Sequence, residues 1–91
     1  MAIHVRRKHA HDSATIRRIV TEVAEELARD LHVNYQWEGD RLTFERIGVH
    51  GYIDVGKDGE LEVYMKKNFL LPFPESWLRE HVDRYLERHL S

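Results

Sequence analysis

The sequence predicts an α+β fold in which a single five-stranded antiparallel sheet carries two helices on one face. Two patterns support this prediction. Four segments between residues 33 and 67 alternate apolar and polar side chains, which is the period-2 pattern of strands with one buried face. Residues 14–31 and 74–90 instead place their apolar side chains on one stripe at helical spacing. The sheet therefore has one apolar face, and the two helices can cover it.

The chain begins with an expected strand, residues 2–8, followed by a loop that leads into the first helix. Asp12 or Ser13 is suited to cap this helix, because either side chain can accept hydrogen bonds from the free N–H groups of the first turn. His9 and His11 lie two residues apart but lack companion ligands, so we expect no metal site. The apolar stripe of the helix consists of Ile16, Ile19, Val20, Val23, Leu27 and Leu31.

The four remaining strands form a meander from about residue 33 to residue 67. Turn-forming residues separate the strands at 38–40 and 57–59, and Gly48 marks a tight turn or bulge between the middle two. In an all-antiparallel arrangement the first strand lies beside the last, which predicts the order 1-5-4-3-2. The complete order of elements is β-α-β-β-β-β-α, similar in outline to a helix-grip arrangement.

Composition narrows the classes of function. The 91 residues are expected to form one domain, residues 1–91, and the absence of cysteine excludes disulfides and thiol chemistry. Sixteen acidic residues outnumber 14 basic ones, and the basic residues at 6–8 and 17–18 lack interleaved aromatics, so we expect no nucleic-acid partner. The longest apolar run, residues 69–73, is far shorter than the ~20 residues of a membrane span. We expect a cytoplasmic protein without a transmembrane segment.

This apolar run is the strongest local feature of the sequence. Its side chains are nearly consecutive between residues 69 and 73 and are bracketed by Pro72 and Pro74, so they cannot all point to one face of a helix or strand. Some of them either close the core or reach solvent, a cavity or a partner. The candidate contact surface consists of Phe69, Leu70, Leu71, Phe73 and Trp77.

A second candidate site is a ligand cavity between the sheet and a helix. Gly51 falls at an inward position, where its missing side chain either admits a close helix or leaves a hollow. Aromatic side chains share this face, and ordinary core packing is the alternative explanation for them. The candidate cavity lining consists of Tyr35, Trp37, Phe44, Gly51, Ile53 and Met65.

The sequence contains no constellation typical of an enzyme. Its serines fall at expected helix ends or at the terminus. His50 and Asp54 share the outer face of one strand, but at ordinary strand rise they lie roughly 13 Å apart, too far for a direct acid–base pair. We therefore expect no catalytic residues, no bound metal and no cofactor.

In combination, the sheet motifs resemble those of the polyhydroxyalkanoic acid system proteins, a family of small bacterial proteins. The resemblance covers essentially the whole chain, including Ile3-x-Val5 with His9 and the helix that follows. It implies an association with polyester synthesis and storage genes and, in some members, with the granule surface. It implies no established catalytic residues. The motifs are Tyr35-x-Trp37-x-Gly39-Asp40-x-Leu42-x-Phe44, Gly48-Val49-x-Gly51-x-Ile53-x-Val55, Leu61-x-Val63 and Leu70-Leu71.

Two functions are therefore expected. The first is a non-catalytic accessory or granule-associated protein of polyhydroxyalkanoate storage, which contacts polyester or a granule protein through its apolar run. The alternative is a module that binds a small apolar ligand, such as an acyl or hydroxyacyl compound, between sheet and helix. The oligomeric state stays open, since an exposed edge strand at residues 33–37 can pair with a second copy.

Overall fold

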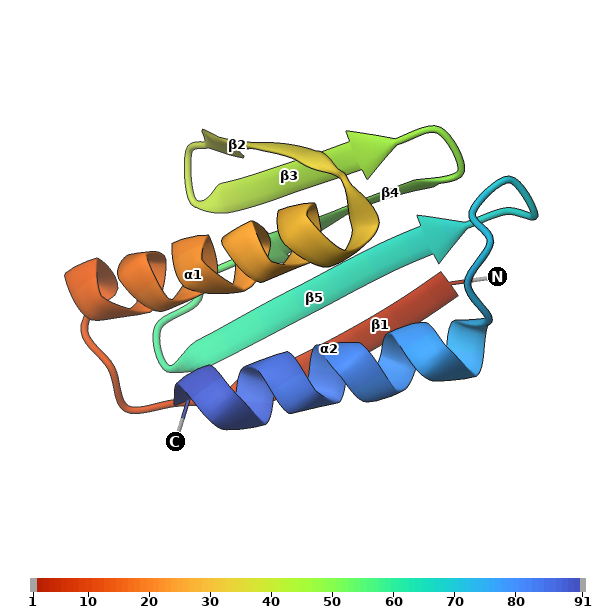
Figure 1. Cartoon of the computed structure of the whole chain (residues 1–91). Helices are drawn as coiled ribbons and strands as arrows, with labels where there is room; N and C mark the ends of the chain where they lie inside the picture. The colour runs from red at the N-terminus through yellow and green to blue at the C-terminus, as the bar shows by residue number, and fades with distance from the viewer. Residues whose placement is uncertain (1, 91) are drawn as a thin grey trace.

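The computed structural model describes residues 2–90 and confirms the α+β fold class (Figure 1). Five strands and two helices follow one another in the predicted order. The elements are β1 (Ala2–Lys8), α1 (Ser13–Leu31), β2 (Asn34–Glu38), β3 (Arg41–Arg46), β4 (Val49–Asp54), β5 (Glu60–Lys67) and α2 (Glu75–Leu90).

All five strands belong to one antiparallel sheet with the order β1-β5-β4-β3-β2, as the sequence predicts. The first strand joins the last through a register that pairs Ile3 with Met65 and Val5 with Val63. All four of these side chains are buried. Apolar side chains therefore lie opposite one another on the inner face, and this matching sets the register.

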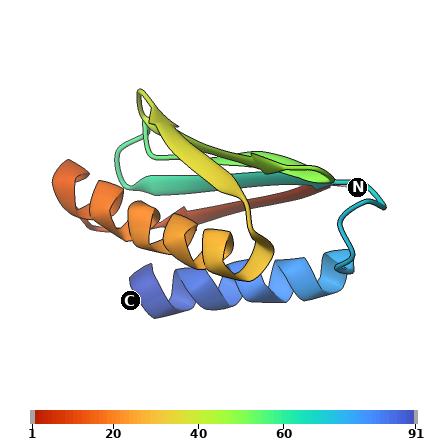
Figure 2. The same ribbon diagram turned by 45° about the horizontal axis from the view of Figure 1, so that its top comes forward.

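Both helices cover the same face of the sheet and run side by side, as Figures 1 and 2 show. Asp12 caps the N-terminal end of helix α1, and its carboxylate accepts a hydrogen bond from the Thr15 N–H at 2.7 Å. This hydrogen bond holds the pKa of Asp12 below its usual range. His32 caps the C-terminal end of the helix: it adopts a left-handed conformation and donates its N–H to the Ala28 carbonyl at 2.9 Å.

The core lies between the sheet and the helices, and the apolar face of each element contributes to it. From the sheet, Leu42 and Leu61 are completely buried, and from the helices Val20 and Leu86 are at most 1% exposed. Because both helices lie on one side, no helix or strand of residues 2–90 covers the opposite face of the sheet (Figure 2).

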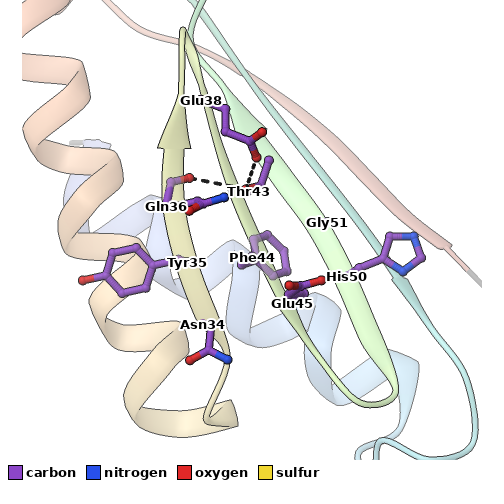
Figure 3. A pocket seen from close by; sticks show the side chains of 9 residues that line it. All are labelled: Asn34, Tyr35, Gln36, Glu38, Thr43, Phe44, Glu45, His50 and Gly51. Carbon is purple, nitrogen blue, oxygen red and sulfur yellow. Dashed lines mark hydrogen bonds between the residues drawn. The ribbon is translucent and has the colours of Figure 1, made fainter.

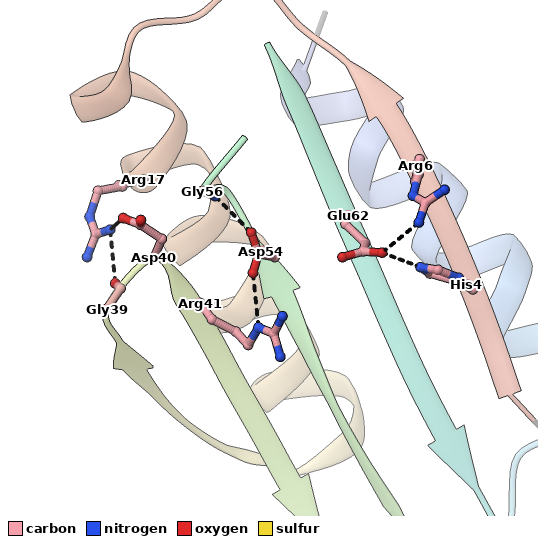
Figure 4. Close-up of polar contacts among 9 residues, drawn as sticks. All are labelled: His4, Arg6, Arg17, Gly39, Asp40, Arg41, Asp54, Gly56 and Glu62. Atoms are coloured by element: carbon pink, nitrogen blue, oxygen red, sulfur yellow. Dashed lines mark hydrogen bonds and ion pairs between the residues drawn. The ribbon is translucent and has the colours of Figure 1, made fainter. Parts of the chain in front are cut away.

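Polar and aromatic side chains occupy this uncovered face. Tyr52 and Tyr64 stack there with ring centroids 5.4 Å apart, and the guanidinium of Arg41 lies 3.7 Å from the centre of the Tyr52 ring. Arg41 also donates to Asp54 at 3.0 Å, and Glu62 accepts from Arg6 at 3.2 Å (Figure 4). The charges on this part of the sheet are thus largely paired within the fold.

The two helices are joined by polar contacts at their shared boundary. The Tyr85 hydroxyl donates to the Asp30 carboxylate at 2.5 Å. Glu26, a buried carboxylate, lies 3.1 Å from Arg88 and 2.6 Å from His89. Burial, followed by the Asp30 carboxylate, raises the pKa of Tyr85 well above its usual value.

Candidate functional site

The apolar run predicted as a contact surface divides between the core and the surface. Phe69 is 89% exposed and Leu70 is 52% exposed, whereas Leu71 is only 2% exposed. Asn68 sets up the turn: its side chain accepts from the Leu70 N–H at 2.8 Å and its carbonyl accepts from the Leu71 N–H at 3.2 Å. Of the two alternatives that the sequence left open, Leu71 therefore takes the first and closes the core, while Phe69 and Leu70 are exposed to solvent.

The β5–α2 loop is held against the turn between β3 and β4. The Asn68 N–H donates to the Gly48 carbonyl at 2.9 Å. Gly48 adopts a φ of +97°, and a Cβ added there would lie 2.6 Å from the backbone nitrogen of Leu71. Only a glycine permits this conformation together with this close approach of two backbones.

This contact places the loop that carries Ile47 against the loop that carries the exposed part of the run. Ile47 is 76% exposed and directly precedes Gly48 in the β3–β4 turn. Figure 1 shows that this turn and the β5–α2 loop lie at the same end of the sheet. Within residues 2–90, four large apolar or aromatic side chains are exposed, and the three on these two loops form what we call the apolar tip: Ile47, Phe69 and Leu70.

The sequence reasoning did not single out Ile47. A signal for it exists, because a large aliphatic residue next to a glycine inside a tight turn has no strand or helix face on which to be buried. The sequence alone, however, does not place this turn next to a loop 20 residues further along the chain.

The other two predicted contact residues are Phe73 and Trp77. Their exposure is intermediate between that of the buried Leu71 and that of the exposed Phe69. Both are half-buried and pack against the core. Their rings stack with centroids 4.7 Å apart, and Trp77 in turn stacks on His81 at 3.6 Å. They form a partly exposed aromatic row at the start of α2, and we do not include them in the apolar tip.

The predicted cavity residues mainly fill the core. Phe44, Ile53 and Met65 are each at most 2% exposed. The space at Gly51 is also taken, since a Cβ added there would lie 2.7 Å from the tip of the Phe44 ring and 2.1 Å from the Tyr64 carbonyl oxygen. On the side of the sheet that faces the helices, Gly51 therefore makes room for Phe44 and the backbone of β5. It neither admits a close helix nor leaves a hollow there, which were the two alternatives from the sequence.

Trp37 and Tyr35 lie near the edge of the sheet on β2. Trp37 is half-buried; its indole N–H donates to the Thr21 hydroxyl at 3.1 Å, and the Arg17 guanidinium lies 4.0 Å from its ring centre. These contacts tie β2 to α1, so Trp37 acts as an anchor between sheet and helix. Tyr35 is 37% exposed.

A hollow of about 440 Å³ lies beside β2, but on the other side of the sheet (Figure 3). Its polar side chains alternate along the strands with the buried ones, and they therefore belong to the face away from the helices. Tyr35, Phe44 and Gly51 adjoin this hollow, whereas Trp37, Ile53 and Met65 do not. The lining residues are Asn34, Tyr35, Gln36, Glu38, Thr43, Phe44, Glu45, His50 and Gly51.

The histidines of the β1–α1 loop form a small cluster. The two rings of His9 and His11 stack at 5.7 Å, and the His9 Nε2 is buried without a hydrogen-bond partner. Burial, with a further contribution from His11, lowers the pKa of His9, which favours its neutral form. Within residues 2–90, no three or more histidine, aspartate or glutamate side chains are grouped as metal ligands.

Comparison with known proteins identifies the family. In the described part of the chain, no helix is long and apolar enough to cross a membrane. Neither the curated proteins nor the solved structures contain a match to the chain. A family model described as "Putative polyhydroxyalkanoic acid system protein (PHA_gran_rgn)" matches residues 3–90. This match covers both helices and nearly all of the sheet, and the chain belongs to the polyhydroxyalkanoic acid system protein family.

Proposed function

We propose that this protein is a non-catalytic accessory protein of polyhydroxyalkanoate storage that attaches to the surface of cytoplasmic polyester granules through its apolar tip. The observation that supports this is the gathering of Ile47, Phe69 and Leu70 on two loops that pack against each other. Exposed apolar side chains that are clustered in this way mark interaction sites more often than scattered ones do. The family supplies the context of polyester storage.

The apolar tip is held in place rather than free to collapse. Leu71 is anchored in the core directly after Leu70, and the Asn68–Gly48 hydrogen bond joins the two loops. A preformed contact surface loses little conformational freedom when it binds. The tip is therefore suited to bind an apolar solid such as polyester.

The size of the tip indicates a weak, reversible attachment. Burying roughly 300 Å² of apolar surface contributes about 7 kcal/mol at about 25 cal/mol per Å². Association itself costs about 4 kcal/mol or more, so only part of this gain remains as binding free energy. A protein that attaches weakly can also interact with granule proteins or exchange between granules.

Co-sedimentation of the full chain with polyhydroxyalkanoate particles, beside inert hydrophilic particles of matched area, tests this proposal. Phe69→Ser/Leu70→Ser is expected to reduce binding at least tenfold, because it removes most of the exposed apolar area without touching the core. Phe69→Leu/Leu70→Met keeps the apolar character and is expected to bind like the wild type. Full binding by a folded serine variant would exclude the apolar tip as the attachment site.

A second candidate function follows from the hollow beside β2. Its volume of about 440 Å³ falls within the range of small-molecule sites. Its hydroxyl, amide and imidazole side chains favour the hydroxyl and ester carbonyl groups of a hydroxyacyl compound over a plain acyl chain, whereas Glu38 and Glu45 disfavour a free carboxylate. A rise in melting temperature with a soluble hydroxyacid ester, lost in Thr43→Val, would support this function, and no rise at millimolar ligand would exclude it.

A further inference from the structure

A basic hollow of about 270 Å³ lies at the base of the apolar tip, where β3, β4 and β5 meet the two loops. It adjoins the tip directly, because Gly48 follows Ile47 and Asn68 precedes Phe69 in the chain, and both belong to the lining. The lining residues are Glu45, Arg46, Gly48, Val49, His50, Lys66, Lys67 and Asn68.

The cations of this hollow have no carboxylate partner in the described part of the chain. The ammonium groups of Lys66 and Lys67 make no ion pair or hydrogen bond within residues 2–90. Arg46 donates to the carbonyl of Leu31, the last residue of α1, at 2.9 Å and to that of Ile47 at 3.2 Å, so its charge interacts with the C-terminal end of the helix and makes no ion pair. The lining thus contains three basic residues, Arg46, Lys66 and Lys67, and a single carboxylate, that of Glu45.

A second hollow on the uncovered sheet face differs in its pairing of charges. A hollow of about 340 Å³ elsewhere on that face is lined by three carboxylates and two cations. Its cations are paired: Arg6 lies 3.2 Å from Glu62, and Lys57 lies 3.5 Å from Glu60 (Figure 4 shows the first pair). Two lysines without an ion pair therefore lie directly beside the apolar tip, whereas the cations of this other hollow are paired with carboxylates of the fold.

We propose that the apolar tip and the basic hollow together bind an anionic lipid surface. Ile47, Phe69 and Leu70 enter its apolar layer. Lys66 and Lys67, which end β5 on the two faces of the sheet, meet the anionic head groups on either side of the tip. The order of apolar and basic groups along the molecule matches the order of layers in a lipid surface, with the apolar layer beneath charged head groups. This inference rests on the proposed function and specifies the chemistry of the surface to which the tip attaches.

Vesicle sedimentation with the full chain tests the inference directly. The vesicles contain phosphatidylcholine alone or with about one-third phosphatidylglycerol. We expect binding to the anionic vesicles to be at least tenfold stronger and to weaken as salt is raised, because salt screens exposed charges. Lys66→Gln/Lys67→Gln is expected to reduce this binding to the level of the neutral vesicles, and Phe69→Ser/Leu70→Ser to reduce binding to both.

The matched control is Lys8→Gln/Lys57→Gln, which removes the same charge from the other end of the sheet. It is expected to bind like the wild type. An equal loss in both lysine variants would overturn the inference, since net charge and not the basic hollow would then be responsible. Equal binding to the two kinds of vesicle would overturn it as well. So would full competition by millimolar inorganic phosphate, which would indicate a site for a small anion.

Bare polyester particles separate this inference from the proposed function. If bare polyester binds the wild type and Lys66→Gln/Lys67→Gln equally, while vesicles show no preference for the anionic lipid, the proposed function stands and the inference fails. If anionic vesicles bind in a tip-dependent way but bare polyester does not, the inference stands and direct contact with the polymer fails. Circular dichroism of each variant confirms folding before binding is compared.

Discussion

Phe44 lays its ring over Gly51, its direct partner across β3 and β4. A Cβ at Gly51 would stand 2.7 Å from this ring and 2.1 Å from the Tyr64 carbonyl oxygen of β5. An aromatic side chain that covers a glycine on the neighbouring strand protects the backbone there and fills the core at the same time. The glycine therefore serves close packing in the centre of the sheet.

Gly51→Ala is expected to destabilise the protein by about 2 kcal/mol or more, because the added methyl must displace the Phe44 ring and the β5 backbone. For a domain of this size, this corresponds to a melting temperature lower by roughly 10 °C. Gly39→Asn is the matched control, since nothing lies within 4 Å of a Cβ at Gly39 and asparagine tolerates its positive φ. A melting temperature unchanged by Gly51→Ala would contradict the packing described here.

The division of the apolar run predicts opposite effects for two adjacent leucines. Leu71→Ala is expected to cost about 2–4 kcal/mol of stability, because it opens a cavity in the core. Leu70→Ala is expected to change stability by less than about 0.5 kcal/mol while weakening attachment to polyester particles. Urea unfolding and co-sedimentation of both variants measure the two effects. Similar stability losses in the two variants would show that Leu70 is also a core residue.

The Tyr85–Asp30 hydrogen bond predicts a loss of stability in strongly alkaline solution. The pKa of Tyr85 is raised in the folded protein, so the folded state retains its phenolic proton when the unfolded chain, with a pKa near 10, has begun to release it. The contribution of Tyr85 to the free energy of unfolding is therefore fully present below pH 10 and decreases as the pH rises further. Urea midpoints of the wild type between pH 9 and 11 should fall more steeply than those of Tyr85→Phe. Parallel curves would exclude this contribution.

The lowered pKa of Glu62 predicts that the stability of the fold decreases as the solution becomes acidic, the opposite direction to the effect of Tyr85. Hydrogen bonds and charge from His4 and Arg6 hold the pKa of Glu62 below its usual range. Its contribution to stability is therefore present above the ordinary glutamate value, near pH 4.3, and is lost as the pH falls through the lower folded value. Because Glu62 is partly exposed, the effect is expected to be small. Glu62→Gln should flatten the fall in urea midpoint between pH 5 and 3 relative to Glu45→Gln, an exposed carboxylate without these partners.

Much of the fold could be read from the sequence because it follows from periodic patterns. The strands alternate with period 2, so the buried side chains of β3 and β4, such as Leu42 and Ile53, could be assigned before their neighbours were known. The strand order followed as well, since short turns force the meander and an antiparallel closure leaves β1 beside β5. The alternatives for Gly51 could not be separated, because its surroundings depend on the Phe44 ring and the β5 backbone together.

The sequence by itself thus determined the fold class, the order of the strands, the inner face of each element and the presence of an apolar run that no single face could bury. Only the tertiary structure decided that Leu71 closes the core, that Phe69 and Leu70 reach solvent, and that Ile47 joins them. The physical reason is that periodicity is local, whereas the exposure of a side chain in a loop depends on distant backbone. Here that backbone is the Gly48 turn, and its hydrogen bond with Asn68 brings the two loops together.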